Sequence, residues 1–185
     1  MSAAADFRRT DALAGPFGWL SVGTRKARVE GMSDDKKITV SRTIDAPAAE
    51  IFDVLTNPDK HVALDGSGFV RSTDKAQRIQ QVGDVFTMNM AGDHMGGEYQ
   101  TDNHVTGYAK DKLLAWQTAP AGTQPPGWEW VWELEPQGPD STLVTQTYDW
   151  SKVTDKDLLA KGLFPLLSAD DMEDTLGKLA EAVAS

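Results

Sequence analysis

The chain has 185 residues, 40% of them hydrophobic and 25% charged, which fits one domain or one domain with a tail. Its formal net charge of -10 argues against nucleic acid or an anionic membrane surface as the main partner, because both need clustered Lys and Arg. The chain has no apolar run near the roughly 20 residues of a membrane span, and it has no Cys, which excludes disulfides and thiolate sites and favours a cytoplasmic location.

The first residues differ in charge from the rest of the chain. Residues 1–31 hold five basic and three acidic residues, a local +2 beside -12 for the remainder. They lack the apolar stretch and the cleavage site of a secretory signal. We therefore expect residues 1–32 to be a poorly ordered N-terminal extension and residues 33–185 to form the domain. An arm that covers a pocket or a partner is the alternative.

The domain opens with a strand and two short helices. Residues 37–44 alternate as a strand whose apolar face also carries Arg42. The Asp-Ala-Pro step at Asp45 predicts a helix start, with Asp45 as the cap. A second short helix is predicted over 59–64, and residues 65–68 read as a tight Gly-Ser-Gly turn rather than a phosphate loop.

A series of alternating segments then predicts an antiparallel sheet. Phe86, Met88 and Met90 share one face of their segment, and Tyr99 and Asn103 share the inner face of the next. The predicted strands cover 69–72, 84–90, 98–108, 113–118, 128–136 and 142–150.

The most regular alternation lies in the strand that follows Gly127. Trp128, Trp130 and Trp132 fall on one face, while Glu129 and Glu133 fall on the other. Each indole can bury on the order of 150–250 Å², so this face must meet another layer, either as solid core or as the wall of a pocket.

The period changes to that of helices after Trp150. Thr154 predicts the cap of a short helix, and Ser168 predicts the start of a final helix. Its apolar stripe consists of Met172, Leu176, Leu179 and Val183. The element order therefore predicts an α+β fold in which a curved antiparallel sheet of about seven strands wraps around a long C-terminal helix.

Four segments carry a family likeness. It is with the START-like helix-grip superfamily (SRPBCC), in the branch of polyketide cyclase/dehydrase and lipid transport proteins, which these segments resemble in order: residues 38–58, the Leu114-Ala115-Trp116 strand, the Trp-rich strand and residues 142–150. The resemblance covers roughly 36–185. It implies a hydrophobic cavity between the sheet and the C-terminal helix, used by relatives for lipids, sterols and polyketides, and it carries no shared catalytic motif.

The inner face supplies the candidate site residues. Polar groups that could orient a ligand there are Arg42, Thr101, Asn103, Gln146 and Tyr148, although each could instead satisfy structural partners. Candidate catalytic residues are Arg42, His94, Asn103 and Tyr148. The predicted ligand-binding residues are Phe86, Met88, Met90, Tyr99, Asn103, Trp116, Trp128, Trp130, Trp132, Gln146, Tyr148, Met172 and Leu176.

Three functional hypotheses follow from these features. The first is a binding protein for a small hydrophobic ligand, the second is a polyketide cyclase or dehydratase that uses the same cavity, and the third is an interaction protein resembling chaperone ATPase activators. The three histidines, His61, His94 and His104, lie in separate elements, so no metal site is predicted, and no nucleotide or dinucleotide motif predicts a cofactor. A homodimer is compatible with the sequence.

Overall fold

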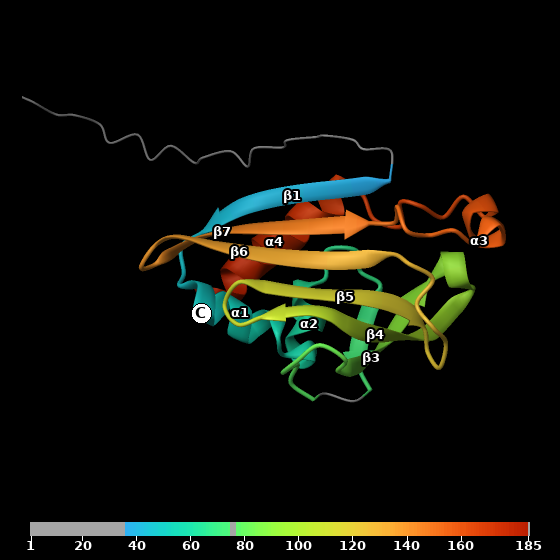
Figure 1. The fold of residues 1–185 in the computed structure, drawn as a ribbon, viewed down its shortest axis with the longest axis horizontal. Coiled ribbons are helices and arrows are strands. Elements are labelled where there is room, and N and C mark those ends of the chain that lie inside the picture. The colour runs from blue at the N-terminus through green and yellow to red at the C-terminus, as the bar shows by residue number, and fades with distance from the viewer. Residues whose placement is uncertain (1–35, 75–76, 185) are drawn as a thin grey trace, which may run out of the picture.

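The protein folds as one antiparallel sheet with helices on its inner face (Figure 1). The computed structural model describes residues 36–74 and 77–184, so the predicted N-terminal extension lies outside the described residues. The strands are β1 (Lys37–Ile44), β2 (Val70–Thr73), β3 (Val85–Gly92), β4 (Gly97–Ala109), β5 (Leu113–Pro120), β6 (Glu129–Gly138) and β7 (Ser141–Asp149). The helices are α1 (Ala48–Leu55), α2 (Pro58–Leu64), α3 (Lys156–Ala160) and α4 (Ala169–Val183), with a 3₁₀ turn η1 (Asp93–Met95).

The strand order across the sheet is β1-β7-β6-β5-β4-β3-β2, and every neighbouring pair is antiparallel. The chain therefore places its first strand beside its last one, and α4 returns across the inner face. A register shift between Val105 and Gly107 marks a bulge in β4, and such bulges bend a strand and increase its twist. The curved seven-stranded sheet around a C-terminal helix confirms the predicted helix-grip fold.

The C-terminal helix α4 has the cap and the stripe that the sequence predicts. Ser168 and Asp171 form a reciprocal capping box, in which each side chain accepts from the other residue's backbone amide. Hydrogen bonds from Ser168 lower the pKa of Asp171. The stripe residues Met172, Leu176 and Leu179 are fully buried, and the helix packs against β1, β7 and the first two helices.

Two of the predicted helix N-caps differ from the structure by one or two residues. Pro47 rather than Asp45 occupies the N-cap position of α1, because the chain turns at once after β1 through a hydrogen bond from the Ala46 amide to the Ile44 carbonyl. Asp155 rather than Thr154 caps α3, and its carboxylate accepts from two amides of the first turn. A carboxylate accepts two such bonds at once, which favours the Asp.

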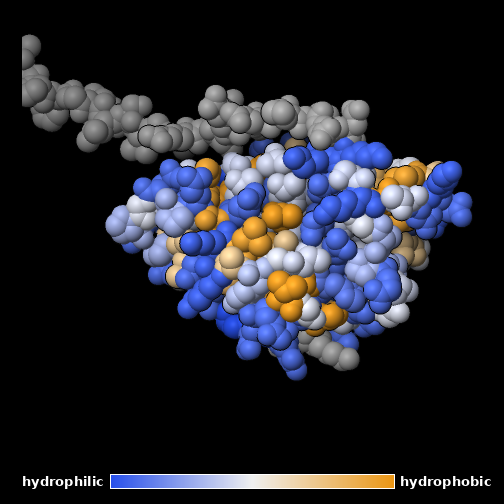
Figure 2. Space-filling view, viewed as in Figure 1, coloured by the Kyte–Doolittle hydropathy of each residue, from blue (hydrophilic) through white to orange (hydrophobic). Residues whose placement is uncertain are grey.

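The outer face of the sheet is polar. Across β1 and β7, the hydroxyls of Thr39 and Thr147 are 3.1 Å apart and those of Ser41 and Thr145 are 2.9 Å apart. Figure 2 looks onto this side and shows mainly hydrophilic residues with small hydrophobic groups between them. The apolar residues of the alternating strands therefore face inward.

The inner face has two differently covered ends. Over β1 and β7 it is covered by α4, whereas toward β2 and β3 the nearer helix is the short α2. Of the helices in the described ranges, none is long and apolar enough to cross a membrane.

Candidate ligand-binding cavity

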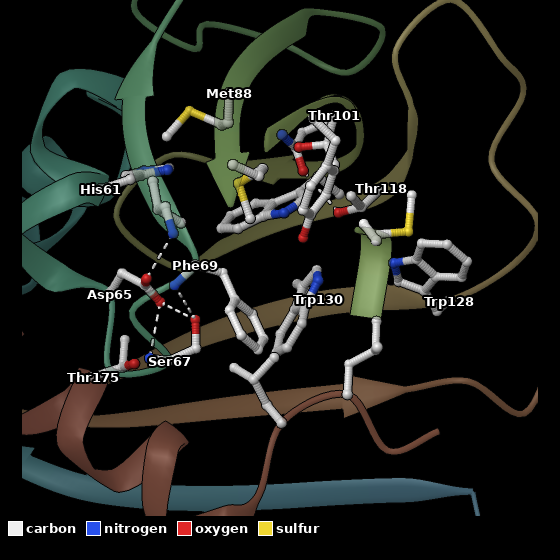
Figure 3. Close-up of a pocket in the computed structure, with 18 of the residues that line it drawn as sticks. His61, Asp65, Ser67, Phe69, Met88, Thr101, Thr118, Trp128, Trp130 and Thr175 are labelled. Atoms are coloured by element: carbon white, nitrogen blue, oxygen red, sulfur yellow. Dashed lines mark hydrogen bonds between the residues drawn. The ribbon is translucent and has the colours of Figure 1, made fainter. Parts of the chain in front are cut away.

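A cavity of about 300 Å³ lies at the end of the inner face away from α4's apolar stripe. Most of its wall is formed by strands β3 to β7, by α2 and the loop after it, and by the segment 163–167, and single residues of α1, β2, α3 and α4 complete it. Figure 3 shows His61 and Met88 on one side of the space and the indoles of Trp128 and Trp130 on the other. The apolar wall residues include Leu55, Leu64, Phe69, Val70, Phe86, Met88, Met90, Leu158, Leu163, Phe164, Leu166 and Leu167.

Four indoles form the aromatic part of the wall. Trp128 precedes β6, Trp130 and Trp132 lie on that strand, and Trp116 lies opposite Trp130 on β5. Trp130 also stacks on Tyr148 of β7, with ring centroids 4.2 Å apart and an interplanar angle of 9°. The alternation of β6 thus places its indoles on one surface, and the neighbouring strands hold them in fixed positions.

His61 of α2 is a neutral polar group inside the aromatic wall. Its Nε2 lies 2.7 Å from the Leu55 carbonyl oxygen, so this nitrogen carries the proton and donates. The ring stacks on Trp116 and meets the edge of Phe86. It is accessible only in part and lines the cavity, and burial lowers the pKa of His61, with the Leu55 hydrogen bond offsetting some of this effect.

The loop after α2 is organised by one carboxylate. Asp65 accepts from the Ser67 amide at 3.0 Å, the Ser67 hydroxyl at 2.6 Å and the Val70 amide at 2.9 Å (Figure 3). The predicted Gly-Ser-Gly turn is therefore held closed by hydrogen bonds to the carboxylate of Asp65, the residue that precedes it. A Cβ at Gly66 would lie 2.1 Å from the Asp171 carbonyl oxygen, so only glycine lets the loop lie this close to α4.

His94 and Tyr99 form a hydrogen-bonded pair in the wall. Tyr99 Oη and His94 Nε2 are 3.1 Å apart, and the His94 ring also contacts Phe69. Burial, and then the charge of Asp65, raise the pKa of Tyr99. Tyr99 therefore stays protonated, and its hydroxyl can donate to His94 or to a ligand.

Asn103 and Thr118 pair across β4 and β5. The Thr118 hydroxyl donates to Asn103 Oδ1 at 2.7 Å, and Asn103 Nδ2 donates to the Phe86 carbonyl at 3.3 Å. Asn103 is only 5% exposed. Its predicted inward orientation is thus confirmed, and protein groups already satisfy its oxygen and one N–H.

Charged groups are few in the wall. Asp65 and Lys161 are its charged side chains, and Asp65 is occupied by the loop that it organises. In the two described segments of the chain, no three His, Asp or Glu side chains lie close enough together to hold a metal ion. The cavity is chemically an apolar space with a few neutral polar groups.

Most of the predicted site residues line this cavity, and four do not. The lining residues are Phe86, Met88, Met90, His94, Tyr99, Thr101, Asn103, Trp116, Trp128, Trp130, Trp132 and Gln146. Met172 and Leu176 are in the packed core between α4 and the sheet. Tyr148 is fully buried beneath Trp130, and burial raises the pKa of its phenol. Arg42 is exposed on the edge strand, near Gly177 of α4.

The sequence interpretation missed the side of the cavity opposite the sheet. His61, Asp65 and Phe69 come from α2 and its loop, and the segment 163–167 supplies Leu163, Phe164, Leu166 and Leu167. The segment 163–167 is an apolar run in a stretch without regular structure, and this is the one sequence signal that could have identified it as part of the wall.

Two curated relatives match most of the chain. An uncharacterized protein of Mycobacterium tuberculosis strain H37Rv, Rv0088, is 33% identical over 154 residues, and the uncharacterized protein MT0096 of Mycobacterium tuberculosis strain CDC 1551 is 32% identical over 154 residues. Each match covers 78% of this chain and 64% of the relative. The matched part of the chain thus spans 64% of the length of these relatives, which is less than two thirds.

Solved structures share the fold at low sequence identity. Protein Ms6760 from Mycobacterium smegmatis has a TM-score of 0.57 and 13% identity, over 86% of this chain and 95% of that chain. The Zhui aromatase/cyclase from a Streptomyces species has a TM-score of 0.56 and 12% identity, over 80% and 93%.

The family model described as polyketide cyclase / dehydrase and lipid transport matches residues 35–184. This range includes every element of the sheet, the four helices and the whole cavity wall. The chain therefore belongs to the polyketide cyclase / dehydrase and lipid transport family.

Proposed function

We propose that the protein binds a small hydrophobic ligand in the cavity between the sheet, α2 and the segment 163–167. The observation that carries this proposal is a space of about 300 Å³ with four indoles in its wall. Small-molecule sites are mostly apolar spaces of about 300–1,000 Å³ with a few placed polar groups. The volume suits a molecule of two or three rings or a short acyl chain. The family description, which names lipid transport, supports the same function.

Binding without chemistry is better supported than catalysis. Of the four candidate catalytic residues, Arg42 and Tyr148 are not in the cavity wall, which leaves His94 and Asn103. Asn103 is committed to Thr118 and Phe86. A cyclase or dehydratase would depend on His94 and its partner Tyr99, and the name of the aromatase/cyclase with the same fold is the main argument for it.

Titration with the neutral dye N-phenyl-1-naphthylamine tests the binding function. We expect saturable fluorescence enhancement at one site, with quenching of the protein's Trp emission. Met90→Trp would fill part of the cavity and should weaken binding by about tenfold or more, since an occupied space must first be vacated. Val85→Trp is the matched control, because Val85 is on the same strand but 48% exposed on the other face.

Two results would contradict the proposal. The first is the absence of saturable dye binding together with a clean unliganded mass for protein purified from its host and measured by native mass spectrometry. The second is equal loss of dye affinity in Met90→Trp and Val85→Trp, because this would mean that the dye binds outside the cavity.

A further inference from the structure

Two residues of the cavity wall each carry a buried polar atom that has no hydrogen-bond partner in the described structure. The two atoms are Trp132 Nε1 and Gln146 Oε1, on side chains that are only 3% and 5% exposed. Within the described residues, the Gln146 side chain makes no hydrogen bond to protein at all. Buried polar groups almost always have a partner, so an orphaned pair at a cavity needs an explanation.

The two residues are direct neighbours. Trp132 on β6 lies opposite Gln146 on β7 in the strand register, so both side chains project from the same face of the sheet. One presents an N–H donor and the other a carbonyl acceptor. The other polar pairs in the wall differ, because Asn103 with Thr118 and His94 with Tyr99 already satisfy each other.

The chemistry of this pair selects a neutral group that both accepts and donates. A hydroxyl accepts from the indole N–H and donates to the amide oxygen, whereas a carboxylate cannot donate. The charged wall residues, Asp65 and Lys161, come from other elements and neither is beside Trp132 or Gln146 in the sheet. Four indoles and Phe86 surround the space with flat aromatic surfaces, which suit a ring.

We propose that Trp132 and Gln146 are the polar anchor for the hydroxyl group of a neutral, ring-containing ligand. This inference rests on the ligand-binding function proposed above and specifies its ligand class. The hydroxyl lies between the two side chains, and the ring system extends along the indole wall toward Trp130 and Trp128.

Competition between matched probes tests the anchor. Displacement of N-phenyl-1-naphthylamine gives dissociation constants for 2-naphthol, which has the hydroxyl, and for 2-methylnaphthalene, which has a methyl group in its place. The measured quantity is the preference for 2-naphthol, expressed as the ratio of the two constants. We expect this ratio to fall by about tenfold in Gln146→Met and by a similar factor in Trp132→Phe, as each substitution removes one hydrogen bond.

The design is insensitive to partial unfolding. Both probes are measured on the same variant, so the fraction of folded protein cancels in the ratio. Tyr148→Phe is the matched control, because it removes a buried hydroxyl two residues along β7 from Gln146 but outside the cavity wall. Its ratio should equal that of the wild type. In the wild type, 2-methoxynaphthalene should bind more weakly than 2-naphthol and more tightly than 2-methylnaphthalene, because its oxygen accepts from Trp132 but cannot donate to Gln146.

The outcomes separate the anchor from the binding function. An unchanged ratio in Gln146→Met and Trp132→Phe overturns the anchor and means that the pair holds only water, while binding itself stands. A fall of the ratio in Tyr148→Phe alone also overturns it. Failure of all three probes and the dye to bind the wild type overturns the binding function and the anchor together.

Discussion

The two ends of the sheet's inner face have similar sequence patterns but different interiors. At the β1 and β7 end, Val144, Leu176 and Leu179 are at most 1% exposed, α4 packs against both strands, and none of these three residues lines the cavity. At the β3 to β6 end, Met90 and Trp130 are only partly buried and face the cavity. Both ends alternate apolar and polar residues.

The difference arises from what lies opposite the strands. The stripe of α4 is long enough to fill the space over β1 and β7. Over the other end lie the seven-residue α2 and a segment without regular structure. Bulky side chains on a strand therefore do not specify a core by themselves, because the opposing layer decides whether the space is filled.

The largest expected effect is a difference in the stability lost when either of two buried leucines, Leu176 or Leu64, is shortened to alanine. Leu176→Ala, at the filled end, should reduce the free energy of unfolding by about 2–5 kcal/mol, because a new cavity replaces close packing. Leu64→Ala should cost less, because Leu64 is 3% exposed yet lines the existing cavity and has fewer contacts to lose. Urea unfolding followed by far-UV circular dichroism measures both. Equal losses would mean that the two ends are equally packed.

Substitutions that enlarge a side chain compare the same two ends, because extra volume costs stability only where the space is already filled. Val144→Leu should destabilise the protein by about 1–3 kcal/mol, since a fully buried Val in a packed core has no room for another methylene. Thr101→Leu projects into the cavity, and the Thr101 hydroxyl makes no hydrogen bond to another described residue, so the cost should be smaller. Thermal unfolding of the two variants measures the difference. A larger cost for Thr101→Leu would contradict the presence of usable space.

The sequence alone predicts the fold well because the fold follows local patterns. The alternation of Trp128, Trp130 and Trp132, the four- and three-residue spacing of the α4 stripe and the Ser168 cap each indicate one structure. The prediction is wrong at the start of α1, where it assigns the N-cap to Asp45 and the structure has Pro47, two residues later. Such choices depend on how the preceding strand ends.

The candidate site is less predictable because a cavity depends on distant segments. Nothing in the pattern around Tyr148 separates it from Gln146, since both face inward on β7, yet Gln146 lines the cavity and Tyr148 lies beneath Trp130. Likewise Met172 and Leu176 face the sheet as predicted but meet its filled end. Periodicity identifies the face of a residue and not the depth of what lies opposite.

The smallest expected effect is a pH dependence of stability. It tests the surroundings of His61, at the end of the inner face that holds the cavity. Burial lowers the pKa of His61 below its ordinary 6.5, so the unfolded state binds more protons than the folded state below that pH. The free energy of unfolding should therefore fall as pH falls from about 6.5, by up to about 1.4 kcal/mol per pH unit, until the lowered folded pKa is reached. Unfolding in urea between pH 7.5 and 5 measures this slope.

His61→Phe is the matched variant for this slope, because it retains a ring beside Trp116 and Phe86 but removes the titrating group. Loss of the hydrogen bond to the Leu55 carbonyl shifts the whole stability curve and leaves its slope unaffected, so the difference in slope reports His61 alone. Identical slopes would mean that His61 is as well solvated in the folded protein as in the unfolded chain. A bound apolar ligand removes the remaining contact with water, so the slope should extend to lower pH when N-phenyl-1-naphthylamine occupies the cavity.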